Sequence, residues 1–271
     1  MQIRAYIPGV YQTSGFRLKL NMSSPIEIEI KLCETVELLD GCVELQRDVF
    51  DLPEIELSPV RHFIVTMHAG GFTLGAFDKN NLIGFCLSVP AFIDGERAFY
   101  SHMTAVHPRY QSRGIGSRLK WAQRERSLEL GVKKIKWTFQ PEKALNAFFN
   151  LEKLGAEVVA YMPNFYGTDY GAGFGVDKIR ISSDRLFAIW NLDSEKVVQL
   201  AAGKAPKRLR KPVEYIETTA NWGELLMSDR ATAASEQERI RREFQDCFAN
   251  GLVCRGFRKH ESHPKYKLYE R

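Results

Sequence analysis

The sequence predicts a mixed α/β fold, and two observations carry this prediction. Stretches in which apolar and charged residues alternate, as in 26–30, have the period of half-buried strands. Stretches with apolar residues every three or four positions, as in 35–50, have the period of amphipathic helices. Because the two kinds of stretch interleave along the chain, helices and strands are expected to build one α/β architecture.

In the first half of the chain, turn residues help to predict where helices and strands begin and end, alongside the periodicity of apolar residues. Residues 60–69 fit either a helix or a strand and end at Gly70-Gly71. Asp78-Lys-Asn-Asn81 separates two apolar runs and therefore predicts a hairpin. The expected elements are a strand over 26–30, a helix over 35–50, strands over 72–77 and 82–89, and, after a turn at 95–97, a strand over 98–106.

The second half is punctuated by glycine and proline. Gly131 suits the C-cap of a helix over 114–130. Pro141 suits the first residue of the next helix, which is expected to run to Gly155. The other expected elements are strands over 132–139, 158–162, 185–192 and 213–218, a helical region over 221–248, and a closing hairpin from 254–258 and 266–269.

Charge divides the chain and predicts its domains. Residues 1–195 hold 22 Lys/Arg and 23 Asp/Glu, whereas residues 196–271 hold 16 and 10, a net charge of +6. The basic peak at 204–211 fits either an anionic partner or a solvated linker between domains. Few aromatic residues accompany it, so a nucleic-acid partner is not expected. The expected domains are an N-terminal extension over 1–24, a main domain over 25–195 and a basic C-terminal extension over 196–271.

Two features at the ends of the chain remain open in the sequence. Either Met1 or Met22 fits the start of translation. The C-terminal extension fits either packing on the main domain or an interface in a homodimer.

Composition indicates a globular protein. The 271 residues are 44% hydrophobic and 26% charged, and no apolar run approaches the roughly 18 residues of a membrane helix. No membrane partner is therefore expected. Five scattered cysteines argue against a disulfide framework and predict a reducing, cytoplasmic location. The spacing of Cys247, Cys254, His260 and His263 is not that of a zinc finger, so no metal is expected.

The stretch 106–119 points to the chemistry. Its turn, Gln111-Ser-Arg-Gly-Ile-Gly116, places two glycines between an expected strand and an expected helix. Glycine lets backbone N–H groups approach a ligand, and a helix N-terminus adds unpaired donors and a positive dipole end. Together they would bind a pyrophosphate. The spacing fits neither a Walker loop nor a dinucleotide fingerprint. The alternative is a turn whose glycines serve only packing.

The turn resembles the acyl-CoA loop of the GNAT acyltransferase superfamily. The resemblance rests on Gln/Arg-x-x-Gly-x-Gly after a strand that ends in Val106, with Leu119 in the following helix. It extends to 134–138, which look like the fifth strand of the family, and to 146–155, whose Glu-Lys-Leu-Gly ending looks like that of the fourth helix.

The motifs at 101–103, 119–124 and 137–139 are similar to a narrower group of larger prokaryotic GNAT proteins with a C-terminal extension. The resemblance covers about residues 26–192. It implies a mixed, mostly antiparallel twisted sheet flanked by helices, followed by a C-terminal α+β extension.

The resemblance also implies a cosubstrate, acetyl-CoA or another acyl-CoA. In the family the fourth and fifth strands splay apart and the pantetheine inserts between them. Arg109 and Arg118 are further candidates for its phosphates. The residues expected to bind the cosubstrate are Thr104, Ala105, Val106, Gln111, Ser112, Arg113, Gly114, Ile115, Gly116, Ser117 and Asn146.

Acid–base chemistry needs titratable groups near the thioester. His102 is the candidate base, since it precedes the loop on a strand where many relatives carry a Glu and histidine titrates near neutral pH. Its alternative is a core histidine. Leu151 stands where many GNAT enzymes carry a tyrosine acid. That departure leaves Tyr166, or the nearby Tyr161, as the candidate acid, and the alternative for each is an ordinary packed tyrosine.

The expected function is therefore an N-acyltransferase. It would move an acetyl or related small acyl group to a primary amine, a small metabolite such as an amino acid, by direct attack. The alternative, favoured by Leu151, is a non-catalytic acyl-CoA-binding sensor with the same fold. The acceptor is expected to meet the loops 51–60, 90–97 and 163–183, and the glycine-rich stretch 170–175 is expected to cover it.

Overall fold

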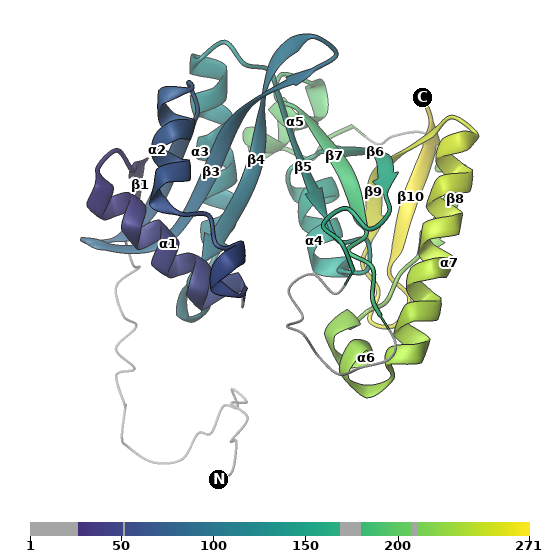
Figure 1. Ribbon diagram of the computed structural model, residues 1–271. Coiled ribbons are helices and arrows are strands. Elements are labelled where there is room, and N and C mark those ends of the chain that lie inside the picture. The colour runs from purple at the N-terminus through teal and green to yellow at the C-terminus, as the bar shows by residue number, and fades with distance from the viewer. Residues whose placement is uncertain (1–26, 51, 169–179, 208–210) are drawn as a thin grey trace, which may run out of the picture.

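The computed structural model describes residues 27–50, 52–168, 180–207 and 211–271 (Figure 1). Its strands form a ten-stranded sheet in the order β1-β2-β3-β4-β5-β7-β6-β9-β10-β8. The strands are β1 (Ile28–Leu32), β2 (Phe72–Asp78), β3 (Asn81–Ile93), β4 (Glu96–Val106), β5 (Lys134–Phe139), β6 (Glu157–Met162), β7 (Arg185–Asn191), β8 (Glu214–Glu217), β9 (Leu252–Arg258) and β10 (Lys265–Glu270).

Helices connect and cover these strands. The α-helices are α1 (Val36–Phe50), α2 (Val60–His68), α3 (Ile115–Glu129), α4 (Ala144–Phe148), α5 (Glu195–Ala201), α6 (Trp222–Ser228) and α7 (Arg230–Ala249). Short 3-10 turns lie at Glu54–Glu56 and Pro108–Tyr110, and a π-helical turn, η3 (Phe149–Lys153), continues α4.

The strands β1 to β4 form an antiparallel meander covered on both faces. On one face α1 and α2 bury an apolar cluster that includes Phe63 and Phe85, whose rings meet edge to face with centroids 5.8 Å apart. On the other face α3 buries Leu119 completely. Because successive strand residues point to opposite faces, both faces of this half of the sheet carry apolar side chains.

The sheet changes direction at its middle. β4 and β5 are parallel and pair at Phe99–Ile135 and Tyr100–Lys136, and the remainder of β4 has no pairing with β5. Beyond this contact β5 pairs antiparallel with β7 over its whole length. The two halves of the sheet therefore diverge on one side of a short parallel contact, and Figure 1 shows β4 and β5 separating there.

The C-terminal segment continues the same sheet. β9 joins β6 at the pair Val158–Cys254, and β10 and β8 follow at the edge. The helix α7 packs on these strands through Phe244, whose ring centroid lies 5.0 Å from that of Tyr266 and 5.8 Å from that of Tyr161. Aromatic rings from both parts thus share one apolar core.

The structure confirms the predicted fold class, a mixed and mostly antiparallel sheet flanked by helices. The ambiguous segment 60–69 is the helix α2. The predicted start of the helix over 141–155 was wrong, because the helix begins at Ala144. Its second half is the π-helical turn. α5 was not predicted, and neither was the junction of β9 with β6. The domain boundaries stay a prediction, and residues 1–24 lie outside the described residues.

Across the described part of the chain, no helix is both long and apolar enough to cross a bilayer.

Candidate active site

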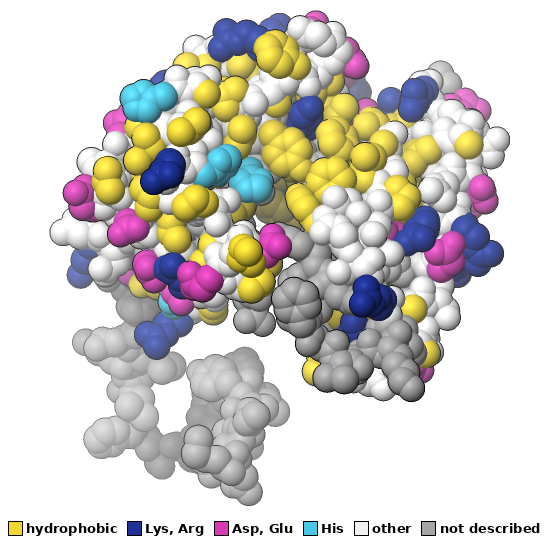
Figure 2. Space-filling model, viewed as in Figure 1, with side chains coloured by type: hydrophobic (Ala, Val, Ile, Leu, Met, Phe, Trp, Pro, Cys, Tyr) yellow, Lys and Arg dark blue, Asp and Glu magenta, His cyan; other side chains and the backbone are white. Residues whose placement is uncertain are grey.

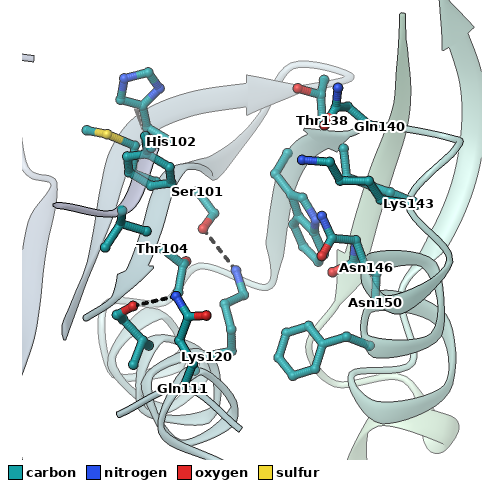
Figure 3. Close-up of a pocket in the computed structure, with 18 of the residues that line it drawn as sticks. Ser101, His102, Thr104, Gln111, Lys120, Thr138, Gln140, Lys143, Asn146 and Asn150 are labelled. Carbon is teal, nitrogen blue, oxygen red and sulfur yellow. Dashed lines mark hydrogen bonds between the residues drawn. The ribbon is translucent and has the colours of Figure 1, made fainter. Parts of the chain in front are cut away.

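A cavity of about 1200 Å³ opens where β4 and β5 diverge. Its walls come from β4 and α3 on one side and from β5, α4 and η3 on the other, as Figure 3 shows. Figure 2 shows the molecule hollowed between the same two parts. Past Tyr100, the backbone groups of β4 that point toward β5 have no strand partner. Such groups keep their hydrogen-bonding capacity for a ligand.

The glycine turn closes one end of this cavity. Gly114 is the N-cap of α3 with φ of 78°, a left-handed conformation that glycine adopts without strain. The first helical bond within α3 runs from the N–H of Arg118 to the carbonyl of Gly114. The N–H groups of Ile115, Gly116 and Ser117 therefore have no acceptor inside the helix. All three residues line the cavity, so these donors form an anion-binding end.

Most of the residues predicted to bind the cosubstrate line the same cavity. Those that do are Thr104, Val106, Gln111, Ser112, Gly114, Ile115, Gly116, Ser117 and Asn146. Gln111 turns its amide back, and Nε2 donates to the carbonyl of Val106 at 2.9 Å. Ala105, also on β4, is buried in the apolar cluster under α1 and α2 and is not part of the lining.

The cavity lining contains none of the three arginines suggested for phosphates, Arg109, Arg113 and Arg118. The guanidinium of Arg113 lies 5.5 Å from the ring centroid of Tyr110. Arg118 donates from Nη2 to the backbone carbonyl of Ile28 on β1. The anion-binding end is therefore made mainly of backbone donors.

His102 lies in the cavity lining, on the side away from the glycine turn. Its ring is open to the cavity on one side, while Nε2 lies 3.2 Å from Ser58 Oγ and the ring centroid lies 5.6 Å from that of His62. Desolvation by the surrounding protein, with a smaller contribution from His62, lowers the pKa of His102 to about 4. The imidazole is therefore neutral at pH 7, with a lone pair available to accept a hydrogen bond.

Lys120 lies at the bottom of the opening between the strands, and no role was predicted for it. Its side chain extends from α3 into the cavity lining, where Nζ donates to Ser101 Oγ at 2.9 Å (Figure 3). Nζ also donates to Gln123 Oε1 at 2.6 Å. The residue is 4% exposed. Burial lowers the pKa of its ammonium to about 8. One signal could have found it, since Gly116 and Lys120 are four residues apart on one helix face.

The opposite wall is built by α4 and the π-helical turn. Asn146 and Asn150 line the cavity, whereas Leu151 is fully buried in the core. Leu151 therefore leaves no side chain in the cavity where the family's tyrosine would lie. Tyr161 does not replace it, because its hydroxyl donates to Asp184 Oδ2 at 2.6 Å and the residue is outside the lining.

The other end of the cavity draws on distant segments. Tyr166 lines it with 40% of its surface exposed, and the guanidinium of Arg185 lies 5.0 Å from its ring centroid. Lys143 lines it too, and burial together with nearby Arg185 lowers the pKa of its ammonium. Trp222, at the start of α6, brings the C-terminal segment into the same wall.

Charge in this lining is one-sided. The described lining residues include the cations Lys120, Lys143, Lys153 and Arg185, with Glu56 as the acidic residue. An anionic ligand would be attracted along most of the cavity.

Other predicted features lie elsewhere. Of the basic stretch 204–211, the structure describes 204–207 and Lys211, and Lys207 forms an ion pair with Glu195 at 2.8 Å. The glycine-rich stretch 170–175 lies outside the described residues. His263 pairs with Glu217, with Nδ1 and Oε1 2.6 Å apart, and Cys254 is buried in the core. The described residues hold no group of three His, Cys, Asp or Glu side chains that could bind a metal.

Several solved structures align with the chain. One is the ribosomal-protein-S18-alanine N-acetyltransferase from Escherichia coli, at 15% identity over 68% of this chain and 99% of that chain, with a TM-score of 0.49. An N-acetyltransferase from Staphylococcus aureus Mu50 has 12% identity, coverage of 62% and 99%, and a TM-score of 0.49. A GNAT family acetyltransferase from Elizabethkingia anophelis with acetyl-CoA bound has 15% identity, coverage of 60% and 97%, and a TM-score of 0.44.

No curated protein matches the sequence. The sequence model of the acetyltransferase (GNAT) family matches residues 39–156. That segment holds the strand divergence, the glycine turn of α3 and the asparagines of the opposite wall. Residues 39–156 are therefore similar in sequence to the acetyltransferase (GNAT) family.

Proposed function

We propose that this protein is an N-acyltransferase that moves an acetyl or related small acyl group from acyl-CoA to a primary amine by direct attack. The observation that carries the proposal is one continuous cavity with two different ends. Backbone donors of the glycine turn suit the pyrophosphate, and the unpaired edge of β4 suits the pantetheine amides and the thioester carbonyl. We propose acyl-CoA as a cosubstrate and no metal.

The residues of the cavity support direct attack. The nitrogen of a neutral amine adds to the thioester carbonyl carbon, and the N–H groups of β4 beyond Tyr100 would stabilise the oxyanion. His102 would accept the proton that the amine loses, directly or through water, because its imidazole is neutral at pH 7. Tyr166 was expected as an acid; it lines the cavity beside Arg185, and we propose that it orients the acceptor there.

The charge of the cavity supports a small acceptor that carries an anionic group, as an amino acid does. Lys143 and Arg185 lie at the end of the cavity away from the glycine turn, where the acceptor would enter. A carboxylate placed between them would gain charge-assisted hydrogen bonds and relieve their mutual repulsion. A soluble amine with a carboxylate therefore fits this end better than a purely cationic polyamine does.

The proposal is tested by ligand-dependent stability and by thiol release. Acetyl-CoA, succinyl-CoA and longer acyl-CoAs are added in thermal unfolding experiments. A ligand present at about 100 times its Kd stabilises the folded state by about 2.7 kcal/mol, which raises Tm measurably. A panel of amines with and without a carboxylate is then assayed for release of the CoA thiol. Absence of any shift in Tm with every acyl-CoA would contradict the proposal.

A second candidate is a non-catalytic acyl-CoA sensor, which we carry because Leu151 is fully buried and Tyr161 is bound to Asp184. A sensor would be stabilised by acyl-CoA, but none of the amines would cause release of the CoA thiol. The same two measurements therefore separate the candidates. The proposed cytoplasmic location and the homodimer are independent of both, and size-exclusion chromatography with light scattering tests the latter.

A further inference from the structure

Lys120 is a buried cation held by neutral partners. Two of its three N–H bonds go to Ser101 Oγ and Gln123 Oε1, and its Nζ lies 4.3 Å from the ring centroid of Trp137 and 5.4 Å from that of Trp190. Among the described residues no carboxylate forms an ion pair with it. A buried charge without a counterion is costly, so such a group is kept where an anion arrives during function.

The groups that face this ammonium come from every element around it. Ser101 belongs to β4, Gln123 to α3, Trp137 to β5 and Trp190 to β7. The titratable neighbour is Cys86 on β3, whose pKa burial raises to about 12, so the thiol is uncharged at neutral pH. Gln123 is itself fixed, because its Nε2 donates to Ser88 Oγ at 2.7 Å. The protonation state of Lys120 therefore depends mainly on its burial and on the charge of a ligand bound in the cavity.

The position of Lys120 lies between the two ends of the cavity. It is one helical turn beyond Gly116 of the anion-binding end, and its partner Ser101 precedes His102 on β4. Ser101 also follows Tyr100, the last residue of β4 that pairs with β5. An acyl-CoA with phosphates at the glycine turn and its acyl carbon near His102 must place its sulfur between these points, above Lys120 (Figure 3).

We propose that the Lys120 ammonium contacts the thioester sulfur and donates the proton that the departing CoA thiolate takes up. This inference rests on the proposed acyl transfer. The amine nitrogen forms its bond to the acyl carbon, the C–S bond breaks, and its electron pair remains on sulfur. That pair takes a proton from Lys120, which becomes a neutral amine. The proton lost by the attacking amine goes to His102 or water, and Lys120 recovers a proton from solvent in the cavity.

The acidity of Lys120 suits this role. With a pKa of about 8, the ammonium is protonated at neutral pH and gives up its proton more readily than an exposed lysine does. An alkyl thiol such as cysteine has a pKa of about 8.5, and proton transfer is most effective between groups of matched pKa. The chain would thus supply by a lysine on α3 the proton for which Leu151 offers no donor.

The test compares CoA with desulfo-CoA, which lacks the sulfur, in calorimetric titrations that need no acceptor. An ammonium that stabilises the thiolate lowers the thiol pKa, and each unit of lowering is a tenfold gain in thiolate binding while the lysine stays protonated. Because Lys120 is mostly neutral at pH 9, the preference should be largest at about pH 8, where we expect the unaltered protein to bind CoA about tenfold more tightly than desulfo-CoA. Binding at pH 7.5 should also release protons. Lys120→Met should lose both the preference and the proton release, while its Kd for acetyl-CoA changes little.

Lys196→Met is the matched control. Lys196 is also a buried lysine whose pKa burial lowers, but its Nζ donates to the carbonyls of Leu151 and Arg255 outside the cavity lining. It should keep the preference for CoA. If the Lys120→Met variant binds acetyl-CoA and also keeps that preference, the inference is wrong. A change in the variant's choice between acetyl-CoA and succinyl-CoA alone would instead assign the cation to an acyl carboxylate, and would also overturn it.

The inference and the proposed function fail in different ways. If the unaltered protein binds neither acetyl-CoA nor CoA, both are overturned. If it prefers CoA through Lys120 but transfers no acyl group to any amine, the contact with sulfur stands and the sensor replaces the enzyme. Where an acceptor is found, Lys120→Met should also lower kcat by about 100-fold.

Discussion

The two ends of the cavity are built in opposite ways. The end that we assign to the CoA phosphates comes from one continuous turn and uses mainly backbone N–H groups of the first residues of α3. The acceptor end gathers Ser58, His102, Lys143, Arg185 and Trp222, which lie on segments far apart in the sequence. Binding of the cosubstrate requires only a short continuous segment, whereas the choice of acceptor depends on the tertiary packing of several segments. Substitutions at the two ends should therefore affect different steps, cosubstrate binding at one end and acceptor binding at the other.

The largest effect is expected at the glycine turn. Gly114 has a positive φ and Gly116 lies in the first turn of α3, and added methyl groups would meet nothing closer than Val106 Cγ2 at 3.9 Å from Gly116. The double variant Gly114→Ala/Gly116→Ala should therefore fold. The two methyl groups would keep the pyrophosphate from approaching the backbone N–H groups, and the resulting loss of two charge-assisted hydrogen bonds should weaken acetyl-CoA binding by about 1000-fold, measured by calorimetry.

Gly131→Ala is the control for this variant. Gly131 has a φ of 72°, close to that of Gly114, and open space around it, but it lies outside the cavity lining. It should lose similar stability and bind acetyl-CoA normally. Equal affinities in all three proteins would remove the glycine turn from the site.

The next effect is expected at His102. Replacing it with Gln should lower kcat/KM by about 100-fold, since general-base catalysis contributes at least that much. Because its pKa is about 4 rather than near 6.5, activity that needs its neutral form should persist as pH falls from 7 and disappear only as pH approaches 4. His68→Gln, at the exposed end of α2, is the control. An unchanged kcat/KM and pH profile in His102→Gln would exclude it from the mechanism.

A smaller effect is expected at Lys143. Lys143→Gln should raise KM for a carboxylate-bearing amine about tenfold, because one charge-assisted hydrogen bond is lost, while the Kd for acetyl-CoA stays the same. Lys136→Gln is the matched control, since Lys136 lies on β5 outside the lining and donates to the carbonyl of Phe92. If both variants kept the same KM, the anionic acceptor would have to be abandoned.

The last prediction concerns the stability of the fold and Lys120, which lies between the two ends of the cavity. Folding lowers the pKa of Lys120 from about 10.5 to about 8, so the unfolded chain binds more protons between these pH values. The free energy of unfolding should therefore gain a contribution as pH rises from 8 to 10.5, of up to about 3 kcal/mol, and lose it again as pH falls through 8. Urea unfolding of Lys120→Met should lack this contribution, and a rise of equal size in the variant would contradict the assignment.

The sequence predicted what depends on local patterns. The glycine turn and the helix after it were predicted because turn residues and apolar periodicity are visible within a few residues of sequence. The separation of β4 from β5 was implied by the family resemblance. His102 and Tyr166 were singled out as candidates, and both line the cavity. Their catalytic roles stay predictions.

What escaped prediction depends on contacts across the fold. Lys120 looks like any lysine on a charged helix, and only the packing of Trp137 and Trp190 from two other strands makes it buried. Trp222 reaches the cavity because the C-terminal segment extends the sheet, which no pattern within 196–271 indicates. The π-helical turn at Phe149–Lys153 has no local signature either, yet it directs Asn150 to the cavity and Leu151 to the core.

The junction of β6 with β9 has a practical consequence for shortened versions of this protein. If the chain ended before α7, β6 would become an edge strand with unpaired backbone hydrogen-bonding groups. The apolar surface that Phe244 and Tyr266 cover would also be exposed to solvent. Exposed strands of that kind recruit further copies and aggregate. A chain that ends before α7 should therefore be insoluble, so crystallisation and display experiments call for the C-terminal strands to be retained.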